Sequence, residues 1–444
     1  MLLIARNNAN ELLIANTPYF CKQKHMRKYA LILITVFVCP ALLFAQADIT
    51  QHIIPGRTNS QEQQQKPYVI LISADGFRYD LADKYHATNL QQLRSSGVAA
   101  KAMIPSYPSL TFPNHYTIAT GLYPAHHGLV DNTFYDKKRD QIYKLSDRKA
   151  VEDSSWYGGT PLWVLAEKQQ MITASFYWVG AESAIQGVRP TYYYRFNDSI
   201  DMDTRIQEVK NWLTMPEDKR PHLITFYMPQ VDHQEHMYGP DSKEAEEAVH
   251  FVDESIAKMV RMTDSLKLPV NYIFLSDHGM IAVDTVNTLS LPSAIDTTKF
   301  KVPDSDVLLH LYANNPSDIQ PTYAALKKQA VDFDVYLPNE IPARWHYSAS
   351  DDRYNRIGDM ILVPKAPKSF NIRHKKVIPG KHGFDNALPQ MRATFYAWGP
   401  AFKQHLQIDA FENVNVYPLV AKILGLHITD KIDGSIKVLG PVLK

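Results

Sequence analysis

Cysteine is almost absent from this sequence. Only two cysteines occur among the 444 residues, Cys21 and Cys39, and both lie in a segment that we interpret below as removed during export. The remaining chain therefore has no disulfide, no thiolate metal site and no cysteine nucleophile. Its stability must come from a hydrophobic core, for which about 400 residues are sufficient.

An excess of charge of either sign is also lacking. The formal net charge is +1, and 45% of the residues are hydrophobic, a balance typical of a globular chain. It gives no support for a nucleic-acid-binding domain or a polybasic membrane patch. Internal repeats are absent, and the one low-complexity stretch is the glutamine-rich part of residues 48–66. We interpret residues 48–66 as a flexible leader.

The longest apolar run near the start is too short to be a convincing membrane span. Residues 26–47, MRKYALILITVFVCPALLFAQA, have a basic start, an apolar middle and an Ala-Gln-Ala end. This layout predicts a secretory signal peptide cleaved after Ala47. A membrane anchor is the alternative, but a span needs roughly 20 apolar residues. We expect an exported protein, periplasmic or secreted, without a stable membrane span in its mature form, and interpret residues 1–25 as an upstream extension.

Short continuous apolar runs indicate buried strands in the rest of the chain. Such runs lie in residues 67–75, 221–232 and 270–279, and continuous apolarity is typical of strands covered on both faces, as in parallel sheets. Residues 88–97 have a helical period that ends in glycine, and residues 98–105 read as the next strand. This order of elements predicts an α/β fold with a doubly wound, mostly parallel sheet and helices on both faces.

We assign residues 67–444 to a single catalytic domain for the reasons that follow. Within it, the pattern is less regular from about 295 to 375. We interpret residues 295–375 as a smaller α+β insertion.

Three acidic residues follow three of the predicted strands. They are Asp75, Asp232 and Asp277, and in open α/β sheets the carboxyl ends of parallel strands form the edge where ligands bind. Asp75 and Asp277 could each simply cap a following helix. Three such strand endings together favour a shared site.

Histidines lie close to these acids in the sequence. His236 is four residues beyond Asp232, His278 is next to Asp277, and His382 lies in the stretch KHGFDN. Carboxylate and imidazole ligands without sulfur suit catalytic Zn²⁺. Six such ligands are too many for one tetrahedral ion but suit two ions about 4 Å apart. The remaining histidines considered are assigned to the surface or to packing: His115, His126, His127, His222, His233 and His374.

A threonine at the start of a predicted helix completes the pattern. Thr111, in SYPSLTFPNHYTIATG, could be an ordinary helix N-cap, with Pro113 in the first turn. A metal lowers the pKa of a coordinated hydroxyl, so Thr111 could also be a nucleophile. Free N–H groups at the helix start attract anions, and Asn132 could donate its amide N–H to a phosphate oxygen. The same position at the start of the helix would allow Thr111 to act as a cap or as a nucleophile.

These motifs resemble the nucleotide pyrophosphatase/phosphodiesterase family of the alkaline phosphatase superfamily, of the bacterial type. The likeness covers most of residues 67–440 and rests, in order, on SADGFRYD, PSLTFPNHYTIATGLYPAHHG, DNTFYD, VDHQEHMYGP, SDHGM and KHGFDN. It implies an alkaline-phosphatase-like fold and two Zn²⁺ per chain. The resemblance assigns one ion to Asp232, His236 and His382, and the other to Asp75, Asp277 and His278 with Thr111 bridging to it.

The resemblance also implies how substrate is held. Asn132 would steady the phosphoryl group, and two aromatic side chains would enclose the leaving nucleoside. Phe112 matches the first aromatic, although it could also be a core residue. For the second we favour Tyr193 among the tyrosines of RPTYYYRF, residues 189–196.

The expected activity is hydrolysis of phosphodiester or pyrophosphate bonds in small-molecule substrates, through a phospho-threonine intermediate. A phosphomonoesterase is the alternative, with Arg78 as a candidate for the extra positive charge that such enzymes supply. A non-catalytic nucleotide-binding protein is a second alternative, although it would not need Thr111. Sulfatases of the superfamily need cysteine or serine, proline and arginine where this chain has Thr111, Pro113 and His115. The sequence leaves the natural substrate and the oligomeric state open.

Overall fold

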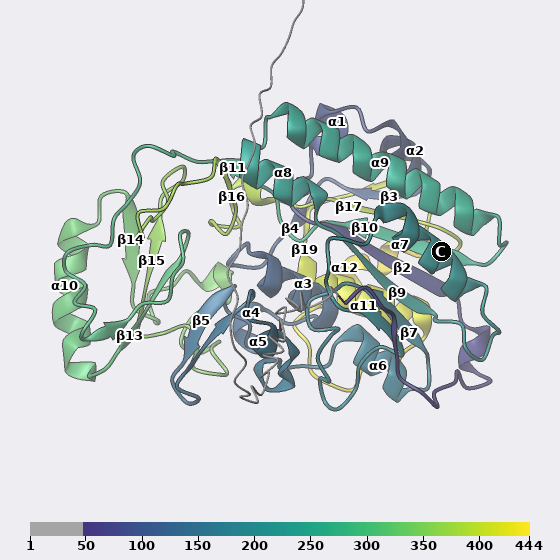
Figure 1. Ribbon diagram of the computed structural model, residues 1–444, viewed down its shortest axis with the longest axis horizontal. Helices are drawn as coiled ribbons and strands as arrows, with labels where there is room; N and C mark the ends of the chain where they lie inside the picture. Colours follow the sequence, from purple (N-terminus) through teal and green to yellow (C-terminus); the bar gives the residue numbers. More distant parts are fainter. Residues whose placement is uncertain (1–47) are drawn as a thin grey trace, which may run out of the picture. The chain divides into compact units, whose positions relative to one another are not determined.

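A nine-stranded sheet forms the centre of the computed structural model, which describes residues 48–444 (Figure 1). Seven strands run in one direction, and the edge strand β1 and the inner strand β17 run antiparallel to their neighbours. In spatial order the strands are β1 (His52–Ile53), β8 (Tyr192–Tyr194), β7 (Thr173–Phe176), β9 (Leu223–Met228), β2 (Tyr68–Ala74), β10 (Val270–Leu275), β17 (Phe395–Trp398), β3 (Val98–Ala100) and β18 (Leu406–Ile408).

The central strand β2 shows why the sequence predicts a sheet covered on both faces. All seven of its residues are buried. Because successive side chains in a strand point to opposite faces, Val69 and Leu71 pack into one hydrophobic core and Ile70 and Ile72 into the other. A strand between two cores has no solvent-facing side, which explains the continuous apolar run.

Helices cover both faces, as the sequence predicted. On the face that β2 meets through Ile70 and Ile72, buried side chains come from α1 (Leu81–Lys84), α2 (Thr88–Ser96), α7 (Met202–Leu213), α8 (Gln230–Tyr238) and the long α9 (Lys243–Asp264). The other face is covered by α3 (Thr111–Thr120), α4 (Pro124–His127), α5 (Arg148–Glu152), α6 (Leu162–Lys168), α11 (Val416–Leu424) and α12 (Ile436–Leu439). Figure 1 shows the two groups on opposite sides of the sheet. The prediction of a doubly wound, mostly parallel α/β fold is confirmed.

A second, smaller sheet has its own core. It contains β12 (Phe300–Lys301), β13 (Leu309–Ala313), β15 (Met360–Pro364) and β14 (Phe333–Tyr336) in that spatial order, all antiparallel. The helix α10 (Ile319–Gln329) packs on this sheet and buries Leu326 in its core. This lobe falls within the range 295–375 that we interpreted as an α+β insertion. Short strand pairs lie elsewhere: β4 (Met103–Ile104) with β19 (Phe411–Glu412), β5 (Thr133–Asp136) with β6 (Gln141–Lys144), and β11 (Ile281–Ala282) with β16 (Gly380–Lys381).

The interpretation of residues 48–66 as a flexible leader is wrong. β1 pairs with β8 at the edge of the main sheet. Asn59 is buried, donates from Nδ2 to the carbonyls of Glu217 and Arg220 at 2.8 and 2.7 Å, and accepts from the Ile172 N–H at 2.6 Å. These hydrogen bonds hold a polar segment that lacks the apolar residues of a core element.

Two sequence interpretations fall on residues that the structure does not describe. These are the upstream extension, residues 1–25, and the signal peptide, residues 26–47. Among residues 48–444, none of the helices combines the length and the apolar character needed to cross a bilayer.

Candidate metal centre and active site

The three predicted acids meet at one edge of the sheet. β9, β2 and β10 are neighbouring parallel strands, and their carboxyl ends lead into Asp232, Asp75 and Asp277. The turn after β2 needs a glycine, because Gly76 has a φ of 71° and a Cβ there would lie 2.9 Å from the Cα of Asp232. The Gly76 N–H also donates to Oδ1 of Asp277 at 3.3 Å. This turn brings all three acids together.

One group of potential ligands consists of Asp75, Asp277 and His278. The Nε2 atom of His278 lies 2.9 Å from Oδ2 of Asp277 and 3.4 Å from Oδ1 of Asp75. All three side chains are almost completely buried. Their ligand atoms are close enough together to hold a metal ion.

A second group consists of Asp232, His236 and His382. His236 Nε2 lies 3.3 Å from Oδ1 of Asp232 and 3.1 Å from Nε2 of His382, and the last atom lies 3.6 Å from the same carboxylate oxygen. Asp232 and His236 are one turn apart on α8, and His382 follows β16. His278 lies close enough to Asp232 and His382 to form a ligand group with them as well, so the two groups adjoin.

Hydrogen bonds fix the orientation of the three imidazoles. Nδ1 of His236 lies 2.8 Å from the Gly380 carbonyl, and the corresponding distances are 3.0 Å for His278 to Gly279 and 2.9 Å for His382 to Ser109. A carbonyl can only accept, so each Nδ1 carries a hydrogen and each Nε2 faces the cluster. Metal-binding histidines are held in this way by their outer neighbours.

The carboxylates have oxygen atoms that lack hydrogen-bond donors. Oδ1 of Asp75, Oδ1 of Asp232 and Oδ2 of Asp277 are buried and have no hydrogen-bond partner among the described residues. A buried carboxylate oxygen without a partner is costly. Three such oxygens beside three Nε2 atoms form a nitrogen and oxygen donor set that fits divalent cations, zinc in particular.

The pKa shifts agree with a site built for positive charge. Burial, followed by repulsion from Asp277 and Asp232, holds the pKa of Asp75 well above its usual value. Burial opposes ionisation of Asp277, yet the adjacent His278 and His115 imidazoles hold its pKa well below the usual range. Burial lowers the pKa of His382, and the imidazoles of His278 and His236 add to this effect. His382 is therefore neutral at pH 7, the form that binds metals.

Thr111 lies beside this cluster, but it is not the helix cap. The N-cap of α3 is Leu110, and Thr111 is the first helical residue. Its Oγ1 lies 3.2 Å from Nε2 of His278. The prediction of a capping role is wrong because the hydroxyl faces the histidine and makes no hydrogen bond to the first turn.

Asn132 is held against the start of the same helix. Its Oδ1 accepts a hydrogen bond from the Phe112 N–H at 3.0 Å, and among the described residues its Nδ2 has no acceptor. The first turn has few free donors left, because the Phe112 N–H is used and Pro113 has none. Contacts to an anion at this helix start therefore depend on the Asn132 amide more than the sequence indicated.

The two predicted substrate aromatics are placed differently. Phe112 is partly buried, with its ring 6.3 Å from that of Tyr143. Tyr193 is 6% exposed and stacks on His52 across the β1–β8 pair at 4.9 Å, so the structure does not bring it to the cluster. Side chains alternate along β8, and this alternation was not resolved from the run of three tyrosines.

Phe196 is an exposed aromatic connected to the cluster through Tyr227. It is 44% exposed, and its ring lies 6.1 Å from that of Tyr227. The Tyr227 hydroxyl donates to Oδ2 of Asp75 at 2.5 Å. Sequence analysis missed Phe196, although it ends the same aromatic stretch as Tyr193.

Two further residues bear on the cluster. His115, assigned to the surface or to packing, is buried and packs edge-on against Trp178 and Tyr227. Its Nδ1 also lies 3.2 Å from Oδ2 of Asp277, and its Nε2 lies 2.9 Å from the Ser73 hydroxyl. Its place one turn after Thr111 on α3 was the available signal. Arg78, the candidate for extra positive charge, is paired with Asp80 at 2.6 Å, so its charge is already neutralised.

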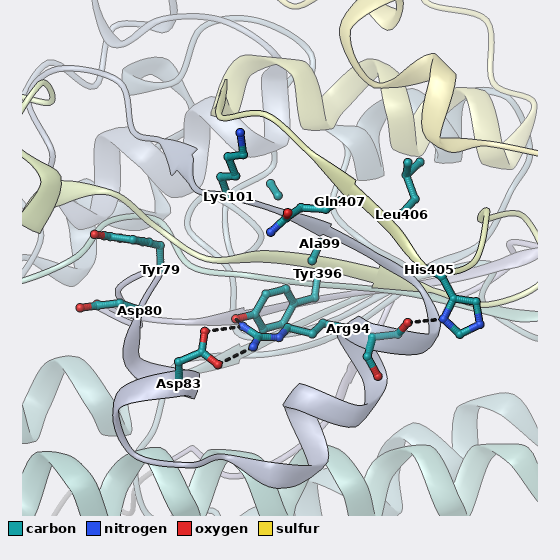
Figure 2. A pocket seen from close by; sticks show the side chains of 12 residues that line it. Tyr79, Asp80, Asp83, Arg94, Ala99, Lys101, Tyr396, His405, Leu406 and Gln407 are labelled. Carbon is teal, nitrogen blue, oxygen red and sulfur yellow. Dashed lines mark hydrogen bonds and ion pairs between the residues drawn. The ribbon is translucent and has the colours of Figure 1, made fainter.

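A cavity of about 470 Å³ lies elsewhere, beside β3, β17 and β18 (Figure 2). It contains none of the cluster residues. Its arginine, Arg94, is paired with Asp83, and the ring nitrogen of His405 is bonded to the Ser95 carbonyl at 2.7 Å. The candidate site is therefore the cluster at the ends of β9, β2 and β10.

Comparison with known proteins shows the family of this chain. A model of the family described as type I phosphodiesterase/nucleotide pyrophosphatase matches residues 69–385. The chain belongs to this family. Its fold is shared with murine ectonucleotide pyrophosphatase/phosphodiesterase 5, with a TM-score of 0.79 and 28% identity over 86% of this chain and all of that one. An inactive variant of that mouse protein, in which a threonine is replaced by alanine, has been solved in complex with AMP and matches equally well in TM-score.

Curated relatives of the family are longer. Human ectonucleotide pyrophosphatase/phosphodiesterase family member 1 is 33% identical over 379 residues, which are 81% of this chain but 40% of the human protein. Venom phosphodiesterase 2 of Crotalus adamanteus is 33% identical over 82% of this chain and 46% of its own length. A pyrophosphatase/phosphodiesterase of Schizosaccharomyces pombe is 34% identical over 86% of this chain and 82% of its own length. The chain thus spans less than half of the two animal proteins and most of the fission yeast protein.

Proposed function

We propose that this chain is an exported hydrolase of phosphodiester or pyrophosphate bonds in nucleotide-like small molecules, with two Zn²⁺ and Thr111 as the nucleophile. The observation that carries the proposal is the position of the Thr111 hydroxyl, 3.2 Å from Nε2 of His278 at the junction of the two ligand groups. Family membership supports the reaction class.

The two ligand groups suggest which residues hold each ion. Asp232, His236 and His382 would hold one, and Asp75, Asp277 and His278 the other, with the Thr111 hydroxyl beside the second. Bound ions would lower the pKa of this hydroxyl and neutralise charge on the phosphoryl oxygens. The orphaned carboxylate oxygens of the acids support this assignment.

The protein's own groups account for the remaining steps. Oγ1 of Thr111 gives up its proton to water and forms a bond to phosphorus. The bond from phosphorus to the leaving oxygen breaks, and this oxygen keeps the electron pair and takes a proton from water where the product is an alcohol. Water then hydrolyses the phospho-threonine. Asn132 Nδ2 is free to donate to a non-bridging oxygen, while its Oδ1 is anchored to Phe112. Phe112 and Phe196 are the aromatics available to contact a base.

The test compares hydrolysis of bis-p-nitrophenyl phosphate and p-nitrophenyl phosphate by the purified protein, with and without a chelator. We expect diester turnover that the chelator abolishes and zinc restores. Monoester turnover far above diester turnover would instead assign a phosphomonoesterase. No turnover of either substrate by zinc-loaded protein would favour a nucleotide-binding protein.

Replacing the nucleophile separates chemistry from folding. Thr111→Ala should abolish turnover and leave about two zinc ions per chain, because the other six ligands remain. Thr214→Ala, at the exposed end of α7, is the matched control and should retain wild-type activity. Unchanged rates in Thr111→Ala would remove Thr111 from the mechanism.

Export is a separate part of the proposal. It rests on the signal-like residues 26–47 and on the names of the relatives, which include an ectoenzyme and a venom protein. Amino-terminal sequencing of the native protein should give Asp48 as the first residue. A native protein that begins at or before Met26 would contradict cleavage.

A further inference from the structure

The segment that carries Asn132 is held by buried side chains of the insertion that contains the smaller sheet. Before Asn132, the Tyr347 hydroxyl donates to the Val130 carbonyl at 2.6 Å. After it, the Tyr135 N–H donates to the Tyr312 hydroxyl at 3.3 Å. Tyr312 and Tyr347 are both almost completely buried. The insertion therefore grips the segment on both sides of Asn132.

His310 makes a third contact, directly next to Asn132. It belongs to β13, and its Nε2 lies 3.2 Å from Oδ2 of Asp131. The side chains of His310 and Asp131 are both almost completely buried. The other oxygen of Asp131, Oδ1, accepts from the Thr133 N–H at 2.9 Å. Asp131 is thus bound to the smaller sheet through one oxygen and across Asn132 through the other.

The hydrogen bonds of His310 indicate where its protons lie. Nδ1 is 2.7 Å from the Ile357 carbonyl, which can only accept, so Nδ1 carries a hydrogen. A neutral imidazole would then turn the lone pair of Nε2 toward the Asp131 carboxylate, and the two would repel. The bond from the Thr133 N–H favours the ionised form of Asp131. We therefore assign a hydrogen to Nε2 as well, so that His310 is a cation that donates to Asp131.

The other contacts of Asn132 do not fix its amide by themselves. Its carbonyl accepts from the Leu145 N–H at 3.0 Å, and its Oδ1 accepts from the Phe112 N–H at 3.0 Å. The second of these is the one hydrogen bond that the structure gives to the side chain. A movement of Asp131 would therefore turn the Asn132 amide relative to Thr111.

We propose that His310 and Asp131 are positioning residues that hold the Asn132 amide where it donates to the phosphoryl group. The inference rests on the proposed function and goes beyond it, because it gives the smaller sheet a part in the chemical step. His310 acts through Asp131, and Asp131 acts through Asn132. A donor contributes most where charge develops in the transition state. Loss of the His310 contact should therefore lower kcat more than it raises KM.

Two substitutions of His310 separate positioning from packing, because each loses one of its two hydrogen bonds. His310→Gln keeps a donor where Nε2 stands and can reach Asp131, whereas His310→Asn keeps the donor to the Ile357 carbonyl. With bis-p-nitrophenyl phosphate, kcat should fall about tenfold in His310→Asn, and His310→Gln should recover most of this loss. His250→Asn, which replaces a 44% exposed histidine on α9, is the control and should keep wild-type kcat. Equal losses in the two His310 variants would overturn the proposal.

A double-mutant cycle tests whether His310 acts through Asn132. In the Asn132→Ala background, His310→Asn should cause no further loss of kcat, because the amide that it positions is already gone. Zinc content near two ions per chain in every variant shows that the metal centre is intact. Losses that multiply in the double variant would overturn the positioning role and leave the proposed function standing.

Calorimetry with orthovanadate tests the same contact without turnover. Five-coordinate vanadate resembles the transition state of phosphoryl transfer. Zinc-loaded His310→Asn should bind vanadate about tenfold more weakly than wild type, and His310→Gln should bind it nearly as tightly as wild type. Equal affinities in the three proteins would overturn the positioning role, with or without turnover. Absence of turnover by wild type, together with weaker vanadate binding by His310→Asn, would remove the proposed function alone.

Discussion

At the scale of single residues, Asp75 is buried beside Asp232 and Asp277, whose negative charges repel its own, and bound cations would relieve this repulsion. Asp75 has a buried oxygen without a donor, and its pKa is raised by burial and by its acidic neighbours. The same arrangement that prepares the site for cations destabilises the protein without them. Function and stability therefore conflict at Asp75.

Asp75→Asn exposes this conflict. In the presence of a chelator, the variant should be more stable than wild type by about 1 to 3 kcal/mol, because a repelling buried acid is removed. With zinc present, it should bind less metal and lose turnover. Urea unfolding with and without chelator measures both effects, and a chelated variant less stable than chelated wild type would contradict the account.

The clustering of the acids and histidines could be predicted from the sequence because each acid follows a buried strand and each histidine is close to an acid or to glycines. The position of Tyr193 could not, because three successive tyrosines differ only in which face of β8 they occupy. Tyr193 is buried against His52, and Phe196 is the exposed ring. Thr111 was singled out in the sequence because of its hydroxyl. The N-cap of α3 is Leu110, however, which is one residue before the predicted cap.

Phe196→Ala tests whether Phe196, rather than Tyr193, contacts the base of a nucleotide substrate. Loss of base stacking should raise KM for a nucleotide substrate about tenfold. Tyr193→Phe keeps the buried ring and should have wild-type KM. Steady-state kinetics with ATP measure both KM values. A raised KM in Tyr193→Phe with an unchanged KM in Phe196→Ala would assign the contact with the base to Tyr193.

At the scale of elements, α3 is fixed from several sides, and this positions its first residue. One contact comes from α4, where His127 is completely buried. Its Nδ1 accepts from the Leu129 N–H at 3.2 Å, so Nε2 carries the hydrogen and donates to the Thr117 hydroxyl at 3.0 Å. A second proton, on Nδ1, would point at the Leu129 N–H, which is itself a donor, and would break this hydrogen bond.

This arrangement gives the fold a pH dependence. Burial lowers the pKa of His127 to about 3, below the ordinary value of about 6.5 that holds in the unfolded chain. The unfolded state therefore binds the extra proton first, and His127's contribution to stability is lost as pH falls from about 6.5 to about 3, at up to about 1.4 kcal/mol per pH unit.

Urea unfolding of chelated protein at pH 7 and pH 5 measures this effect. Wild type should lose about 2 kcal/mol more than His127→Asn between these pH values. Chelation of both proteins removes the separate pH dependence of metal binding. Equal losses in the two proteins would show that His127 is protonated in the folded state.

At the scale of the whole molecule, the fold could be predicted where the burial of an element requires apolar residues along its whole length. β2 lies between two cores and is apolar throughout, so its place in a parallel sheet could be inferred. Residues 48–66 were wrongly interpreted as flexible. Hydrogen bonds of Asn59 hold this segment in place, and such bonds cannot be inferred from a polar, glutamine-rich composition. The smaller sheet could be placed only roughly, because its antiparallel strands come from distant segments.

The central claim is that six acid and histidine side chains hold two cations beside the Thr111 hydroxyl. Anomalous diffraction from zinc-loaded crystals, recorded on both sides of the zinc absorption edge, tests it most directly. The account predicts two zinc peaks per chain, one among Asp232, His236 and His382 and one among Asp75, Asp277 and His278 beside Thr111. A single peak, or zinc bound away from these residues, would contradict it.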